Sequence, residues 1–150
     1  MSDLRKFIAT TIREYLNEQH SVNKTKMVAY HGLSKMKAER LGYGSDITIF
    51  DTNGFYAQRI AGAYFTPFIE EAKKYAKREG DKIYKVELTF ENLANRKTID
   101  QLVPIKVGNN GDDSRKTLIE NGYDGVYDEP MKEIVVFYPE QIKILEIIEI

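Results

Sequence analysis

The sequence contains no cysteine and only two histidines among its 150 residues. Without cysteine the chain has no disulfide, no cysteine-ligated zinc site and no thiol nucleophile, and this says nothing against a reducing compartment. His20 and His31 are too few and too isolated for a metal site, so we expect no metal. The longest strongly apolar run, around residues 134–137, is far too short to span a bilayer, so no membrane association is expected.

The net charge and composition are those of an ordinary globular protein. The formal charge of −1 gives no overall attraction to nucleic acid or anionic membranes, although nucleic acid stays open as a partner. Hydrophobic residues make up 42% of the chain and charged residues 30%, near the averages of globular proteins, so the composition indicates neither a disordered nor a membrane protein. Residues 1–6 lack the apolar core of a signal peptide, so we expect a cytoplasmic protein.

The apolar pattern predicts an N-terminal helix followed by one α+β domain. Residues 3–19 place apolar side chains on one helical face, and residues 18–26 have no apolar rhythm. We therefore assign an amphipathic helix and link to residues 1–22 and a single domain to residues 23–150. The helix is expected to cap the domain, with docking of a partner as the alternative.

Periodicity and capping residues predict the elements of the domain. Residues 91–112 are expected to be mostly loop, and residues 42–62, rich in glycine and aromatic residues, are expected to be a functional loop. Strands are expected at residues 27–31, around 64, and at 83–90, 124–127, 133–138 and 142–148, and helices at 34–41, 67–79 and from 113 or 114 to 121.

Three short segments carry the functional signal. The first is Y-H-G with His31 at its centre, and the second is G-A-Y-F-T with Tyr64, followed eleven residues later by Tyr75. The third is E-I-V-V-F, which begins at Glu133 and is followed by Gln141 eight residues after that glutamate. Read in order they give His, Tyr and Glu on three predicted strands.

This order resembles the H-Y-E constellation of ADP-ribosyltransferases related to diphtheria toxin and the poly(ADP-ribose) polymerases. The interval from Tyr64 to Tyr75 is similar to the G-x-Y-F segment of the polymerases, and the Glu133 strand is similar to their E-Y-I-V-Y-D-x-x-Q strand. The run G-Y-D-G-V at residues 122–126 resembles small, often phage-borne members. The resemblance covers residues 27–148 and implies two small, mainly antiparallel sheets, packed as a split clam around an NAD cleft.

The resemblance also implies a chemistry and a role for each residue. These enzymes break the nicotinamide–ribose bond of NAD, their co-substrate, and pass ADP-ribose to an acceptor. Glu133 would be catalytic, because a carboxylate stabilises the positive charge that develops on the ribose. Tyr64 and Tyr75 would stack on the cationic nicotinamide, His31 would bond a hydroxyl of the adenosine ribose, and Gly32 would let the carboxamide reach the backbone.

Two positions differ from the relatives, and two more residues are candidates for contacts. Ala72 stands where the polymerases have a serine that grips the carboxamide. Leu33 follows His-Gly where many relatives have Thr or Ser, and Ser34 comes one residue later. We expect further NAD contacts at Ser34 and Gln141.

Each site residue also has an ordinary structural interpretation. His31 could be a hydrogen-bonded core histidine, Tyr64 and Tyr75 could be core aromatics, and Glu133 could be a charge at a strand edge. All of these would have to hold together, in the family's order, for the resemblance to be accidental. We therefore favour the enzyme.

The function expected is mono-ADP-ribosyl transfer from NAD to an unknown acceptor, which could be a macromolecule or a small molecule. Similarity to phage-type members suggests an effector or toxin, which would act in the host cytoplasm. The alternatives are an NAD glycohydrolase, a catalytically inactive NAD- or ADP-ribose-binding module, and, least favoured, an RNA 2′-phosphotransferase. The last would need a set of phosphate-gripping arginines, whereas the arginines here are scattered.

Overall fold

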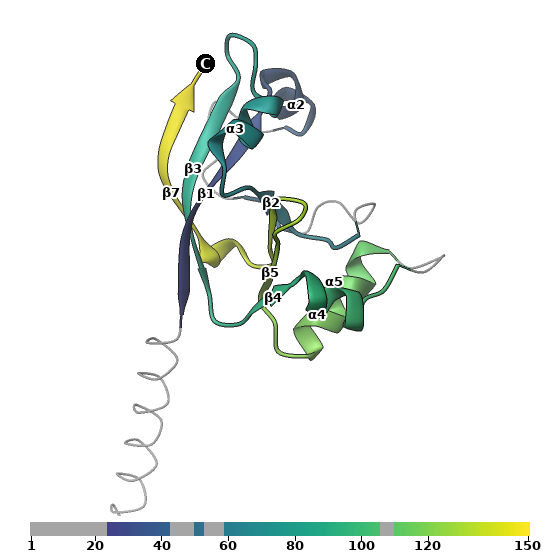
Figure 1. Ribbon diagram of the computed structural model, residues 1–150. Helices are drawn as coiled ribbons and strands as arrows, with labels where there is room; N and C mark the ends of the chain where they lie inside the picture. Colours follow the sequence, from purple (N-terminus) through teal and green to yellow (C-terminus); the bar gives the residue numbers. More distant parts are fainter. Residues whose placement is uncertain (1–23, 43–49, 53–58, 106–109) are drawn as a thin grey trace, which may run out of the picture.

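The computed structural model describes residues 24–42, 50–52, 59–105 and 110–150. In these ranges seven strands form two sheets accompanied by helices, so the expected α+β content and two sheets are confirmed (Figure 1). The predicted helix at residues 3–19, the domain boundary after residue 22 and most of the loop at residues 42–62 lie outside the described residues. No helix within the described ranges is both long and apolar enough to cross a membrane.

The first sheet is antiparallel and has the order β1-β3-β7. Its strands are β1 (Thr25–Leu33), β3 (Lys82–Phe90) and β7 (Ile142–Glu149). In the central strand Val86, Leu88 and Phe90 are fully buried. Successive side chains of a strand point to opposite faces, so this alternation directs one face of β3 into the core.

The second sheet has the order β2-β6-β5-β4, in which only β4 and β5 run parallel. Its strands are β2 (Ala63–Phe65), β6 (Glu133–Val136), β5 (Gly125–Asp128) and β4 (Leu93–Asn95). Two helices, α4 (Arg96–Leu102) and α5 (Gly111–Glu120), lie beside it (Figure 1). Ile99 and Leu118 from these helices form a buried cluster with Val126 and Val135 of the sheet.

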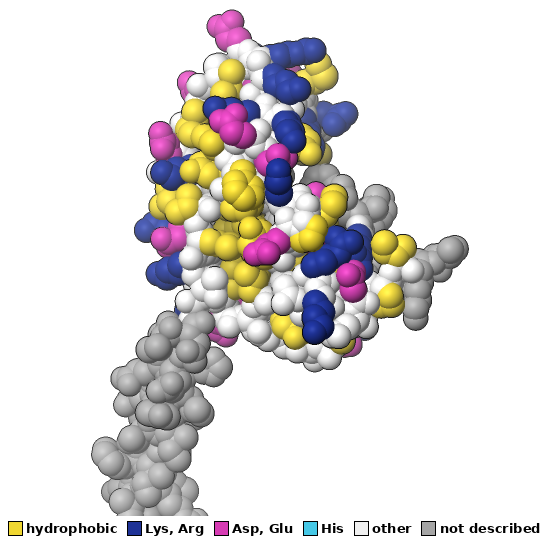
Figure 2. Space-filling model, in the orientation of Figure 1, with side chains coloured by type: hydrophobic (Ala, Val, Ile, Leu, Met, Phe, Trp, Pro, Cys, Tyr) yellow, Lys and Arg dark blue, Asp and Glu magenta, His cyan; other side chains and the backbone are white. Residues whose placement is uncertain are grey.

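The two sheets meet where β1 passes the end of β2. The amide of Tyr30 donates to the carbonyl of Thr66 at 2.8 Å, and the amide of Thr66 donates back at 2.9 Å. A buried cluster that includes Phe65, Tyr84 and Ile134 fills the space between the sheets. Figure 2 shows hydrophobic side chains gathered over the middle of the molecule, where the sheets join.

The helix after β1 forms as predicted. α2 (Lys35–Arg40) begins after Ser34, whose hydroxyl accepts a hydrogen bond from the amide of Lys37 at 3.1 Å. A serine at this position satisfies one of the amides that a helix leaves without a partner at its start.

The helix after β2 is shorter than the 67–79 expected from its capping signals. α3 (Ile69–Ala72) continues as a single 3₁₀ turn, η1 (Lys73–Tyr75), and ends there. The Asp81 carboxylate accepts hydrogen bonds from the amides of Lys77 and Arg78 at 2.9 Å each. Because a side chain holds these two donors, they are not available to another helical turn.

The prediction of a loop over residues 91–112 is wrong, since β4 and α4 both lie there. β4 is too short to show a period in the sequence, and it forms only by pairing with β5. Asn95 begins α4 by accepting a hydrogen bond from the amide of Thr98 at 2.9 Å. Asn110 caps α5 in the same way, so α5 starts at Gly111, earlier than expected. The turn η2 (Pro139–Gln141) separates β6 from β7.

Candidate functional site

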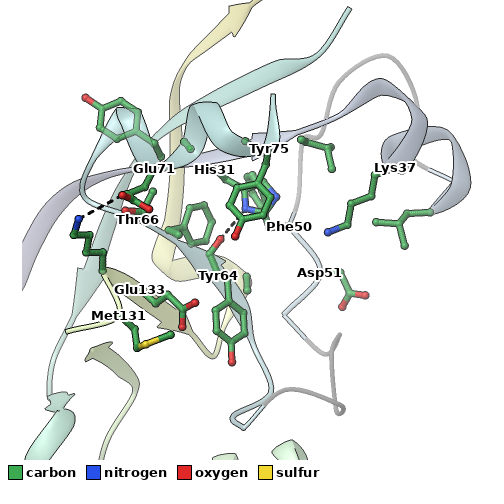
Figure 3. Close-up of a pocket in the computed structure, with 18 residues that line it drawn as sticks. His31, Lys37, Phe50, Asp51, Tyr64, Thr66, Glu71, Tyr75, Met131 and Glu133 are labelled. Atoms are coloured by element: carbon green, nitrogen blue, oxygen red, sulfur yellow. Dashed lines mark hydrogen bonds and ion pairs between the residues drawn. The ribbon is translucent and has the colours of Figure 1, made fainter. Parts of the chain in front are cut away.

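A pocket of about 220 Å³ opens where the two sheets meet. Its walls come from the end of β1, from α2, from residues 50–51, from β2, from α3 and η1, and from the turn before β6 (Figure 3). It is lined by all five residues to which the resemblance gave a role in NAD binding or catalysis, which are His31, Gly32, Tyr64, Tyr75 and Glu133. Residues separated by about a hundred positions in the chain are thus brought to one cavity.

His31 is held at the wall of the pocket by an aromatic cage. Its Nδ1 lies 2.7 Å from the carbonyl oxygen of Tyr64. A carbonyl only accepts, so Nδ1 carries the proton and the neutral ring keeps Nε2 as an acceptor. The rings of Phe50 and Phe65 lie 5.4 Å and 5.6 Å from the imidazole centre. Burial lowers the pKa of His31, as does the positive charge of Lys37.

Tyr64 presents its ring, since its hydroxyl is already bonded. The hydroxyl donates to the carbonyl of Ile60, and the side chain is half-buried. Burial, followed by the negative charge of Glu133, raises the pKa of Tyr64 to about 12. The phenol therefore stays protonated, and the part of the side chain left for a ligand is its apolar face.

Gly32 fits against the chain that carries Tyr75. A Cβ atom at position 32 would collide with the carbonyl oxygen of Ala72 and lie 3.2 Å from Cβ of Tyr75. The glycine was expected to make room for a ligand; the structure shows that it makes room for α3 and η1. This close approach places Tyr75, which is 68% exposed, at the mouth of the pocket.

Glu133 begins β6 with its carboxylate half-buried. No hydrogen bond or ion pair links that carboxylate to any residue the structure describes. Its neighbour Lys132, which has the left-handed backbone angle φ 55°, turns away and pairs with Glu71 at 3.4 Å. Burial raises the pKa of Glu133, and the charge of Asp128 raises it further.

The two further contacts expected from the sequence do not line this pocket. Ser34 uses its hydroxyl to cap α2. Gln141 accepts a hydrogen bond from the amide of Tyr138 at 2.9 Å and donates to the carbonyls of Asp124 and Thr89 at 3.0 Å and 3.2 Å. Its side chain therefore joins the start of β7 to both sheets and has a structural role.

Several lining residues were not singled out in the sequence. They include Lys37, Phe50, Asp51, Glu71 and Met131. Figure 3 shows Lys37 and Asp51 on the side of the pocket away from Glu133. Phe50 and Asp51 fall in the glycine-rich loop expected to be functional, so that loop was the available signal. Lys37 and Glu71 lie on helices that follow the first two motifs, where charge alone gave no reason to choose them.

Most of the chain matches a known protein family. Residues 22–146 match a family described as ADP-Ribosyltransferase in polyvalent proteins. No curated protein matches the chain.

Proposed function

The chain belongs to the family of ADP-ribosyltransferases in polyvalent proteins, and we propose that it is an NAD-dependent mono-ADP-ribosyltransferase of the H-Y-E type. It would release nicotinamide and pass ADP-ribose to an acceptor that is still to be identified. The observation that carries this proposal is that His31, Tyr64, Tyr75 and Glu133 line one pocket, in which the Glu133 carboxylate has no partner among the described residues. The two sheets would act as the halves of a clam around NAD.

In this proposal Glu133 stabilises the transition state. Loss of nicotinamide leaves a ribosyl centre with oxocarbenium character, a problem that glycosidases also solve with carboxylates. An ionised, half-buried carboxylate without a competing cation is well suited to bind the ribose 2′-hydroxyl and oppose that charge. Lys132 would neutralise Glu133 if it pointed toward it, but it is held by Glu71.

The remaining side chains would bind and orient NAD. Nicotinamide is cationic until it leaves, so it is attracted to the faces of Tyr64 and Tyr75. His31 would accept a hydrogen bond from a ribose hydroxyl through Nε2, because Nδ1 is held by the Tyr64 carbonyl. These contacts would form before the bond breaks, so they set affinity more than rate.

The test is nicotinamide release by Glu133→Gln. Glutamine keeps the size and the hydrogen-bonding ability but removes the negative charge. We expect NAD affinity to change little, and kcat to fall by on the order of 10²-fold or more. Glu140→Gln, an exposed acid on η2, is the control and should stay within a few-fold of the parent. A parental rate in Glu133→Gln would show that another carboxylate acts, and a parent that neither binds nor consumes NAD would refute the function.

Product analysis separates transfer from hydrolysis and identifies the acceptor. Labelled NAD is incubated with the pure protein, with and without cell lysate, and the products are then digested with protease or nuclease. Label that a protease releases identifies a protein acceptor, and label that a nuclease releases identifies a nucleic acid. Free ADP-ribose as the sole product would favour the NAD glycohydrolase. An effector role and a cytoplasmic place of action stay predictions from the sequence.

A further inference from the structure

We propose that Asp128 is a positioning residue for Glu133. Arg96 holds Asp128 as a second, buried negative charge, one strand behind the pocket wall. This role rests on the proposed transferase function. Asp128 ends β5, and in the antiparallel pair its Cα is the direct partner of the Glu133 Cα. Directly opposed residues project from the same face of a sheet, so the two carboxyl groups are neighbours.

Arg96 fixes the Asp128 carboxylate in place. The Nη1 atom of Arg96, at the start of α4, donates to Oδ2 of Asp128 at 2.9 Å. Arg96 also pairs with Asp100 at 3.3 Å, and Asp100 pairs with Arg59 at 3.1 Å. Asp128 itself is only 8% exposed. Arg96 therefore holds the Asp128 carboxylate inside the protein, whereas Asp100 is an exposed outer partner of the same arginine and does not itself contact Asp128.

Two features of Asp128 are unfavourable for a residue that only anchors α4. Like charges placed directly opposite each other on paired strands are destabilising. In addition, Oδ1 of Asp128 is buried and has no hydrogen-bond partner among the described residues, which costs free energy. An asparagine could still accept the hydrogen bond from Arg96 without the repulsion. The charge itself is therefore what needs an explanation.

A fixed negative charge at this position would act on the reaction through Glu133. Repulsion from Asp128 directs the Glu133 carboxylate away from β5, and the pocket is the open side. The buried charge also adds to the field that opposes the cationic ribosyl centre, because charges interact more strongly where water is excluded. The same proximity makes Glu133 harder to ionise: burial raises the pKa of Glu133 first, and the charge of Asp128 raises it further.

The other charged and titratable groups around Glu133 do not take over this role. Tyr64 of β2 is a neutral phenol bonded to Ile60. Lys132, directly before β6, is paired with Glu71 of α3, so their charges offset each other. Lys37 and Asp51 lie across the pocket (Figure 3). Asp128 is thus the charged group opposed to Glu133 in the sheet.

The test compares Asp128→Asn and Arg96→Gln by the pH profile of nicotinamide release and by NMR titration of the Glu133 carboxyl without NAD. Asp128→Asn should lower the kcat plateau about fivefold or more, leave KM for NAD within about twofold, and move the acid limb and the Glu133 titration to lower pH. Arg96→Gln leaves Asp128 without its cation. This variant should therefore move the acid limb and the Glu133 titration to higher pH. Asp100→Asn is the control, with a rate within about twofold of the parent and no change in the acid limb.

The outcomes separate this role from the activity itself. An active parent whose acid limb and Glu133 titration do not move in Asp128→Asn would overturn the role of Asp128 alone. An unchanged kcat plateau in Asp128→Asn, or an equal effect of Asp100→Asn, would also overturn that role. If Asp128 and Arg96 had a purely structural role, Asp128→Asn and Arg96→Gln would both lower the rate, but they would not shift the acid limb and the Glu133 titration in opposite directions. A parent that releases no nicotinamide would refute the proposed function, and this role with it.

Discussion

The surroundings of His31 decide what its imidazole can offer a ligand. The carbonyl of Tyr64 fixes the proton on Nδ1, and burial lowers the pKa of the ring. Around neutral pH the His31 ring is therefore uncharged, and its Nε2 accepts hydrogen bonds. Such a ring can bind a hydroxyl group and does not repel a cationic group nearby. Protonation would turn that acceptor into a donor.

His31→Gln should weaken NAD binding by about tenfold, because one amide cannot reproduce both ring contacts. It should also remove a pH dependence of stability. As the pH falls below about 6.5, the unfolded chain protonates His31 before the folded chain does, so the parent loses stability until the lowered folded pKa is passed. Titration calorimetry measures the affinity, and urea unfolding at about pH 7.5 and about pH 5.5 measures the second effect. His20→Gln, which changes the other histidine, is the control, and equal pH dependence in parent and His31→Gln would contradict the assignment.

Among the elements, the contact between β1 and the α3–η1 segment sets one wall of the pocket. Gly32 allows the backbone of Ala72 to approach β1 more closely than any side chain would permit. Tyr75 ends that segment, so its ring is placed by the packing of an element as much as by its own contacts. A small change at Gly32 would therefore move a wall of the pocket.

Gly32→Ala should lower the free energy of unfolding by about 1–3 kcal/mol, because the neighbour that the new Cβ meets is backbone. NAD affinity should fall by about tenfold or more, since Tyr75 shifts with η1. The matched control is Gly122→Ala, at φ 89° with its nearest neighbour 3.9 Å away, far from this pocket. It should cost about 1 kcal/mol in backbone strain and leave the affinity unchanged. Denaturant unfolding and calorimetry decide, and unaltered NAD binding in Gly32→Ala would refute this account of Tyr75.

For the molecule as a whole, the pocket lies across the joint between the two sheets. β1 and η1 belong to one side, and β2 and β6 to the other, with the Tyr30–Thr66 bridge between them. A ligand that contacts both sides would couple the sheets. NAD binding is therefore expected to stabilise the entire domain and not only the pocket.

NAD at about a hundred times its dissociation constant should raise the free energy of unfolding by about 2.7 kcal/mol in one cooperative transition. The amides of Tyr30 and Thr66, which bond across the joint, should exchange more slowly with NAD bound. Urea unfolding and hydrogen exchange measure the two effects. Glu133→Gln should gain as much stability from NAD as the parent does, because Glu133 acts in the transition state. Protection confined to one sheet would show that NAD does not bridge the joint.

The sequence by itself determined the features that depend on neighbouring residues. Alternating apolar residues marked β3, and Ser34 before an apolar period marked α2, because a period and a cap are properties of a few consecutive positions. The eleven-residue interval from Tyr64 to Tyr75, and the apolar run after Glu133, likewise pointed to the family.

Only the tertiary structure decided the features that depend on distant partners. Asp81 ends the helix after η1, Gln141 ties β7 to both sheets, and Asp128 stands opposite Glu133. Such contacts form between segments that strand pairing and core packing bring together, and a local pattern carries no record of them.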